Sequence, residues 1–141
     1  MCAERIWLDI PAAAAYLHLI SECIAELVEH APDVPELERT TYSIQLATQE
    51  IGSNIVRHAY GEADGEARIV AQLCVERSPR RLVIELRDNG LAFDLAQVGE
   101  PDLDEVRVHG YGLFLARTLL DELRYETRPG ENRWRLVKQL G

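Results

Sequence analysis

An amphipathic stretch over residues 36–60 constrains the fold of this chain more than any other feature. Its apolar positions recur at helical spacing: Ile44, Ala47, Ile51 and Ile55. One stripe of a long helix must therefore be buried against another layer. Gly52 lies inside this helix, where glycine costs about 1 kcal/mol relative to alanine, and it indicates close approach by another group such as a neighbouring helix.

Short strand patterns and two further helices account for most of the remaining chain. The predicted strands are residues 5–10, 67–76, 81–87, 123–127 and 133–139, and the other predicted helices run over 11–30 and 112–123. Residues 96–109 have few apolar side chains and predict a long loop. The fold class is therefore α+β, a two-layer sandwich with a mostly antiparallel sheet and helices on one face.

Length and composition limit the number of domains, the cellular compartment and the partners that we expect for this chain. A chain of 141 residues predicts a single domain, 1–141. The sequence contains no run of about 18 apolar residues and no basic-then-apolar leader, so we expect a cytoplasmic protein with no membrane partner. A formal net charge of −9 opposes direct binding to nucleic acid and favours a basic protein surface as partner. Three cysteines far apart in sequence (Cys2, Cys23 and Cys74) predict reduced thiols.

Polar residues follow the buried stripe of the long helix. Glu50, Asn54 and His58 are spaced four apart, so they share one helix face. An amide oxygen is a hard ligand that suits Mg²⁺, and a carboxylate one turn away can accept a hydroxyl proton. For this stripe alone, a solvated helix face is the commoner explanation. Its position beside two other motifs favours a site that holds a metal and a base.

The second motif, Asp88-Asn89-Gly90, follows a strand of apolar residues. A carboxylate at that strand end could accept a hydrogen bond from the exocyclic amine of adenine, and Gly90 would let the chain pass close to a flat base. By itself the tripeptide is a turn signal, since Asn-Gly favours turns.

The third motif, Gly110-Tyr111-Gly112-Leu113, precedes an apolar helix. Glycines before a helix expose backbone N–H groups and the positive end of the helix dipole to an anion. The preceding loop, residues 95–110, could close as a lid over phosphates, with Arg107 and His109 near them. Exposed residues on a mobile loop would give the same pattern.

With these motifs in view, the chain resembles the GHKL (Bergerat-fold) ATPases, and within them the bacterial anti-sigma factor serine/threonine kinases. The segment 47–60 is similar to the N-box of that subfamily, which pairs a Glu with an Asn four residues later and ends in His-Ala-Tyr. The resemblance implies that Glu50 is the general base, that Asn54 binds Mg²⁺ and that Asp88 reads adenine. The implied nucleotide site comprises Asn54, His58, Asp88, Gly90, Ala92, Phe93, Arg107, His109, Gly110, Tyr111, Gly112 and Leu113.

This chain departs from the family pattern at two points. Ala92 stands where the family usually has a second glycine before Phe-Asp, which narrows the room beside the base. Many GHKL proteins also use a threonine of the closing strands near adenine, and the sequence does not place its equivalent.

The resemblance implies an ATP-dependent kinase that phosphorylates a serine on a STAS-domain anti-sigma-factor antagonist, sequesters a sigma factor and forms a homodimer. An ATP-dependent binding module without kinase activity is the main alternative, against which Glu50 argues. A sensor histidine kinase would need a phosphoacceptor helix, and His18 has no acidic neighbour to serve as its base. DNA topology and mismatch-repair ATPases would need a transducer domain, for which the sequence has no room.

Overall fold

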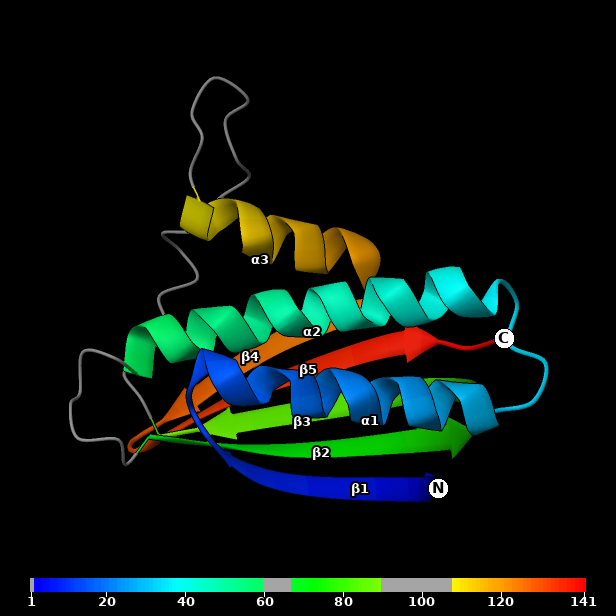
Figure 1. Cartoon of the computed structure of the whole chain (residues 1–141), viewed down its shortest axis with the longest axis horizontal. Coiled ribbons are helices and arrows are strands. Elements are labelled where there is room, and N and C mark those ends of the chain that lie inside the picture. The colour runs from blue at the N-terminus through cyan, green and yellow to red at the C-terminus, as the bar shows by residue number, and fades with distance from the viewer. Residues whose placement is uncertain (1, 60–66, 90–107) are drawn as a thin grey trace.

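Five strands form one antiparallel sheet in the order β1-β2-β3-β5-β4 (Figure 1). The strands are β1 (Cys2–Pro11), β2 (Arg68–Arg77), β3 (Arg80–Asp88), β4 (Glu122–Arg128) and β5 (Glu131–Gln139). The computed structural model describes residues 2–59, 67–89 and 108–141, with the backbone alone at residues 2–3, 58–59 and 108–111. All four strand pairings are antiparallel, so the predicted sheet is confirmed.

Helices cover one face of this sheet. They are the short 3₁₀ helix η1 (Ala14–Tyr16) and the α-helices α1 (Leu17–His30), α2 (Leu37–Ala59) and α3 (Val108–Leu119). Helix α2 packs against both α1 and α3, and Figure 1 shows it between them. The predicted α+β two-layer arrangement is therefore confirmed. Within the described residues, no helix combines the length and the apolar character needed to cross a membrane.

The core lies between the helices and one side of the strands. Alternate residues of β2 and β3 point into it, because successive side chains of a strand face opposite sides. The most completely buried of its large side chains include Ile20, Ile24, Ile44, Ile51, Ile69, Leu73, Ile84, Leu86, Trp134 and Leu136. All four residues of the predicted stripe of the long helix, Ile44, Ala47, Ile51 and Ile55, are buried in this core, so that part of the prediction is correct.

Two predicted helix starts are wrong. Pro11 pairs with Arg68 at the end of β1, and α1 begins only at Leu17, after η1. Proline needs no ladder N–H at the end of an edge strand, so the residue that suits a helix start also suits a strand end. Helix α3 begins at Val108, four residues earlier than predicted, which places His109 and Gly110 inside a helix and not in the loop.

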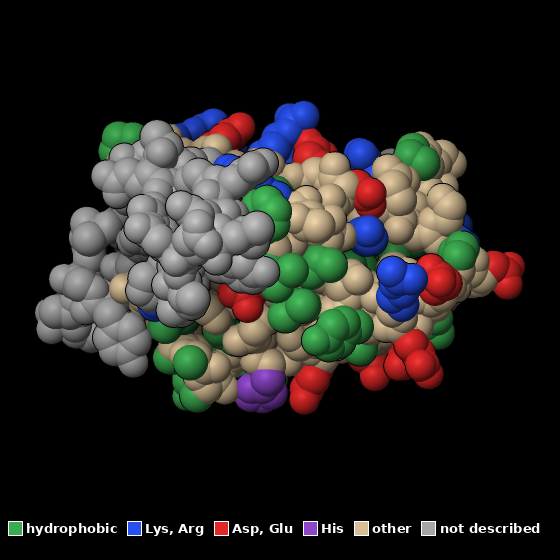
Figure 2. Space-filling view, turned by 90° about the horizontal axis from the view of Figure 1, so that it is seen from above, with side chains coloured by type: hydrophobic (Ala, Val, Ile, Leu, Met, Phe, Trp, Pro, Cys, Tyr) green, Lys and Arg blue, Asp and Glu red, His purple; other side chains and the backbone are tan. Residues whose placement is uncertain are grey.

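Charge is distributed unevenly over the two layers. Residues 6–38, which contain α1, include seven Asp and Glu residues and no Lys or Arg. Most of the chain's Lys and Arg residues lie in the strands, on the side of the sheet away from the helices or at its ends. Figure 2, which views the molecule from above α3 in Figure 1, shows carboxylates along its lower and right-hand rim, with Lys and Arg side chains elsewhere on the same face. The segment around α1 is therefore acidic, whereas the strands pair their arginines with glutamates.

The cysteines differ from one another. Cys23 is free, as predicted, and its pKa is raised by partial burial and by the carboxylates of Glu22 and Glu26. Cys74 is disulfide-bonded, so the prediction of reduced thiols is wrong for this residue. Cys74 lies on β2, which pairs with strands from distant parts of the sequence, and sequence spacing therefore could not exclude a bond there.

Candidate functional site

Glu50 of α2 and Gly112 of α3 are in direct contact. A Cβ atom built on Gly112 would lie 2.2 Å from Oε2 of Glu50, far closer than two such atoms can approach. Glycine at this position therefore makes room for the carboxylate, which is half-buried between the helices. Two motifs that lie about 60 residues apart meet at this contact.

Gly52 has a different neighbour. A Cβ atom there would lie 3.0 Å from Cδ2 of Leu17, on α1. The predicted close approach of a neighbouring helix is therefore confirmed, and it is a packing contact within the core. Because Glu50 and Gly52 project from different sides of α2, this helix contacts α3 with one and α1 with the other.

Asn54 lies one turn after Glu50, and only 2% of it is exposed. Its Oδ1 accepts a hydrogen bond from Nη2 of Arg57, while its Nδ2 is buried without a hydrogen-bond partner among the described residues. An unsatisfied buried amide costs about 1–3 kcal/mol. Buried polar groups in folded proteins usually have a hydrogen-bond partner. A bound ligand that accepts a hydrogen bond from Nδ2 would explain why this group has none among the described residues.

Arg57 is a residue that the sequence motifs did not single out. It follows Asn54 by three positions on α2, so both lie on one helix face, and that spacing is the signal that could have indicated the contact. A cation at the Asn54 oxygen would have to replace this guanidinium. Amide oxygens suit Mg²⁺, so Asn54 fits such an ion chemically. Among the described residues there is no cluster of three His, Cys, Asp or Glu that could hold a metal.

Asp88 ends β3 with its side chain on the buried side of the sheet, and 7% of it is exposed. Asn132 lies opposite it on β5, and Nδ2 of Asn132 donates to Oδ1 of Asp88 at 3.0 Å. The Asn132 oxygen in turn accepts from the hydroxyls of Tyr125, at 2.9 Å, and Thr127, at 2.8 Å. The closing-strand residue that contacts the predicted adenine carboxylate is therefore an asparagine.

The start of α3 differs from the predicted glycine loop. Gly110 and Gly112 lie within the helix, and among the described residues the backbone N–H groups without a partner inside the helix are those of residues 108–110. That turn can still attract an anion. Leu113 is fully buried in the hydrophobic core and anchors α3.

Several predicted site residues lie outside the described residues. They are Gly90, Ala92, Phe93 and Arg107, together with most of the predicted lid, residues 95–110. The side chains of His58, His109 and Tyr111 also lie outside them. What the structure brings together is Glu50 and Gly112 at the α2–α3 contact, with Asn54 one turn further along α2 and Asp88 on the sheet beneath the helices.

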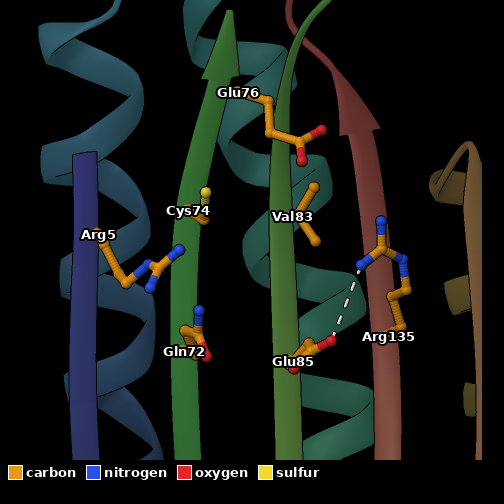
Figure 3. A pocket seen from close by; sticks show the side chains of 7 residues that line it. All are labelled: Arg5, Gln72, Cys74, Glu76, Val83, Glu85 and Arg135. Atoms are coloured by element: carbon orange, nitrogen blue, oxygen red, sulfur yellow. Dashed lines mark ion pairs between the residues drawn. The ribbon is translucent and has the colours of Figure 1, made fainter. Parts of the chain in front are cut away.

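A separate hollow of about 190 Å³ lies on the sheet face away from the helices (Figure 3). It is lined by Arg5, Gln72, Cys74, Glu76, Val83, Glu85 and Arg135. Arg135 and Glu85 form an ion pair across it, with Nη1 and Oε1 3.8 Å apart. None of the predicted site residues lines this hollow, and its charges pair across neighbouring strands.

Comparison with known proteins gives a family match over most of the chain. The family model described as "Histidine kinase-like ATPase domain" matches residues 10–138. The chain is 32% identical over 133 residues to a protein named "Serine-protein kinase RsbW" from Bacillus cereus (strain AH187), which covers 86% of this chain and 76% of that protein. A protein of the same name from Bacillus anthracis (strain CDC 684 / NRRL 3495) matches with the same identity and coverage.

Solved structures share the fold. A crystal structure of the RsbU and RsbW domains of Rv1364c from Mycobacterium tuberculosis superposes with a TM-score of 0.69 at 18% identity, over 98% of this chain and 33% of that one. The histidine kinase domain of the Erythrobacter litoralis EL346 blue-light activated histidine kinase gives a TM-score of 0.55 at 21% identity, over 92% of this chain and 61% of that one. This chain thus spans about a third of the first structure's length and less than two thirds of the second's. At these identities the two structures establish a common fold.

Proposed function

The chain belongs to the family of histidine kinase-like ATPase domains, and on that premise we propose that it is an ATP-dependent serine-protein kinase that regulates transcription by partner switching. The observation that supports this most directly is the contact between Glu50 and Gly112. It sets a carboxylate beside the helix whose first turn would bind phosphates. A module that only bound ATP would not need a base at that position.

Each proposed role follows from the position of the side chain. Glu50, half-buried against α3, would accept the proton of the substrate serine as the hydroxyl attacks. Asp88 would accept a hydrogen bond from the exocyclic amine of adenine. The first turn of α3, with Gly110, would donate backbone N–H groups to phosphate oxygens, and Gly112 would let the helix pass close to Glu50. Positioning and charge stabilisation would supply most of the catalysis.

Asn54 is the residue that we propose holds Mg²⁺, with phosphate oxygens and water as the other ligands. When bound, the ion would neutralise charge on the phosphate oxygens. Arg57 would release the Asn54 oxygen and become free to pair with a phosphate, and the unpartnered Nδ2 of Asn54 would gain an acceptor. His58, Gly90, Ala92, Phe93, Arg107, His109, Tyr111 and Leu113 remain proposed parts of the nucleotide site or its support.

The partners are proposed from the resemblance. The substrate would be a serine of a STAS-domain anti-sigma-factor antagonist, and the protein would sequester a sigma factor when that antagonist is phosphorylated. We also propose that residues 1–141 form one domain, that it works as a cytoplasmic homodimer, and that it binds neither nucleic acid nor membrane. Disulfides are rare in the cytoplasm, so the Cys74 bond is the described feature that argues against that compartment.

The test is phosphoryl transfer from γ-labelled ATP to each STAS-domain protein of the same genome, with Mg²⁺. We expect label on a serine of one of them. Glu50→Gln should reduce transfer by at least about a hundredfold, within the range known for general bases, and leave ATP binding intact. The matched control is Glu38→Gln, an exposed glutamate in the first turn of the same helix, which should transfer normally.

Other outcomes would assign the site differently. Equal transfer by the Glu50→Gln variant and the unaltered protein would refute the role of Glu50 as base. ATP binding without label on any partner would favour the binding module that sequesters its target. Absence of ATP binding would mean that the chain shares only the fold of this family.

A further inference from the structure

We propose that Asn132, held by the hydroxyls of Tyr125 and Thr127, is a positioning residue that sets the preference of the site for adenine over guanine nucleotides. The inference rests on the proposed function, because it takes Asp88 as the group that contacts the base. It goes further in assigning base selectivity to three side chains of β4 and β5. None of the three belongs to the sequence motifs that predict the nucleotide site.

The three side chains form a chain of hydrogen bonds that ends on Asp88. Asn132 is 3% exposed, and its Nδ2 lies 3.0 Å from Oδ1 of Asp88. Its own oxygen accepts two hydroxyl hydrogen bonds, from Tyr125 at 2.9 Å and from Thr127 at 2.8 Å. Every one of these distances is ordinary for a strong hydrogen bond. The network is therefore satisfied at each step that the structure describes, and such networks restrict the side chains that they join.

The amide of Asn132 is held in one orientation by Asp88 on one side and the two hydroxyls on the other. An amide can be turned so that either its oxygen or its nitrogen faces a neighbour. Because the Asp88 carboxylate only accepts, the amide nitrogen points at Asp88, and the hydroxyls of Tyr125 and Thr127 donate to the amide oxygen and hold it there. The reverse orientation would place the amide oxygen against a carboxylate oxygen, which are two acceptors without a proton between them. Tyr125 is held in turn by Trp134, whose ring centroid lies 4.5 Å from its own.

The fixed amide keeps Asp88 an acceptor with a defined direction. A donor bound to Oδ1 resists rotation of the carboxylate, because rotation would break that hydrogen bond. An ionised carboxylate can only accept hydrogen bonds. Adenine offers a 6-amino donor to such a group, whereas guanine has a carbonyl oxygen at the same position. A carboxylate that could rotate would discriminate less between the two bases.

The test compares the affinities for ATP and GTP by calorimetry in the full chain and in the double variant Tyr125→Phe/Thr127→Val. The variant removes both hydroxyl donors and keeps the aromatic ring against Trp134. We expect the ratio of ATP to GTP affinity to fall by about tenfold or more, since sites built on such hydrogen bonds discriminate strongly. The matched control is Thr41→Val/Tyr42→Phe, which deletes the same two hydroxyls from the exposed start of α2 and should leave the ratio unchanged.

A purely structural role for these side chains would weaken both nucleotides alike. An unchanged ratio in a folded double variant, whether affinity falls or not, would overturn the proposal. If the double variant does not fold, the single variants Tyr125→Phe and Thr127→Val each leave one donor and should each lower the ratio; an unchanged ratio in both would also overturn it. Failure of the unaltered chain to bind ATP would instead overturn the proposed function and this inference with it.

Discussion

Gly112 contributes to the site through the side chain that it lacks. Because Gly112 has no Cβ atom, the Glu50 carboxylate can occupy the space beside its α-carbon. A substitution at Gly112 should therefore disturb the proposed base before it disturbs the fold. The blocking atom, Oε2, is at the end of a flexible side chain and can move away. Alanine is also the better helix former by about 1 kcal/mol, which offsets part of the cost of crowding.

We therefore expect Gly112→Ala to keep its thermal stability and lose phosphoryl transfer. A displacement of the carboxylate by about 1 Å can cost a hundredfold in rate. Single-turnover transfer and thermal unfolding, measured side by side, check both parts. Gly52→Ala is the control, because its new methyl group meets Leu17 in the core and not Glu50. Full transfer activity in the Gly112 variant would show that the position of Glu50 is unimportant.

Residue by residue, the sequence predicted the site through side-chain spacing along single elements. The stripe of Glu50 and Asn54 follows from helical periodicity, and both residues lie where that periodicity placed them. Asn132 could not be predicted in this way, and the spacing of Arg57 from Asn54 shows only that the two side chains share a helix face. Asn132 becomes a neighbour of Asp88 only through the register of β3 with β5, and the Arg57 contact depends on the conformation of a long side chain. Both are contacts of the folded chain.

At the level of elements, hydrophobic periodicity predicted the sheet and α2 well, and the two wrong helix starts both involve residues with two structural uses. Pro11 suits the end of an edge strand as well as the first turn of a helix. The glycines at 110 and 112 suggested a loop, whereas in the structure they lie in a helix, and at Gly112 the small size is needed for packing against α2. Whether Pro11 ends a strand or starts a helix, and whether the two glycines lie in a loop or a helix, depends on the element that packs beside them. The local sequence does not show that element.

The β2–β3 hairpin offers a test of stability against pH. Arg81 hydrogen-bonds the carboxylate of Glu76 and lowers its pKa below the ordinary value. A lowered carboxyl pKa stabilises the fold above the unfolded-state value, about 4.3, and this contribution is lost as the pH falls through the folded-state value. Glu76→Gln should therefore be less stable at pH 7, by less than about 1 kcal/mol for a surface pair.

Urea unfolding of Glu76→Gln at pH 7 and at pH 3 measures this effect. The difference from the unaltered protein should be present at pH 7 and shrink at pH 3, where the carboxyl takes up a proton. Glu126→Gln, on the exposed edge of β4, is the control and should show no such trend. A deficit that is larger at pH 3 than at pH 7 would contradict the role of the ion pair.

For the whole molecule, the proposed homodimer is the property least accessible from one chain. Sedimentation equilibrium at several concentrations should give twice the chain mass, and the mass should fall toward that of one chain on dilution if the dimer is reversible. A constant mass of one chain at all concentrations would rule the homodimer out. The sequence implies a homodimer only through the family resemblance, since nothing in its motifs marks a surface that pairs with a copy of itself.

The separation of charge between the layers has an electrical consequence. With an acidic segment around α1 and arginine-rich strands beneath it, the protein has a dipole moment as well as a net charge of −9. A charged partner is turned by that field while still at a distance, so it arrives with one side already facing the helix layer. Added salt shortens the reach of the field, and should slow capture more than it speeds release.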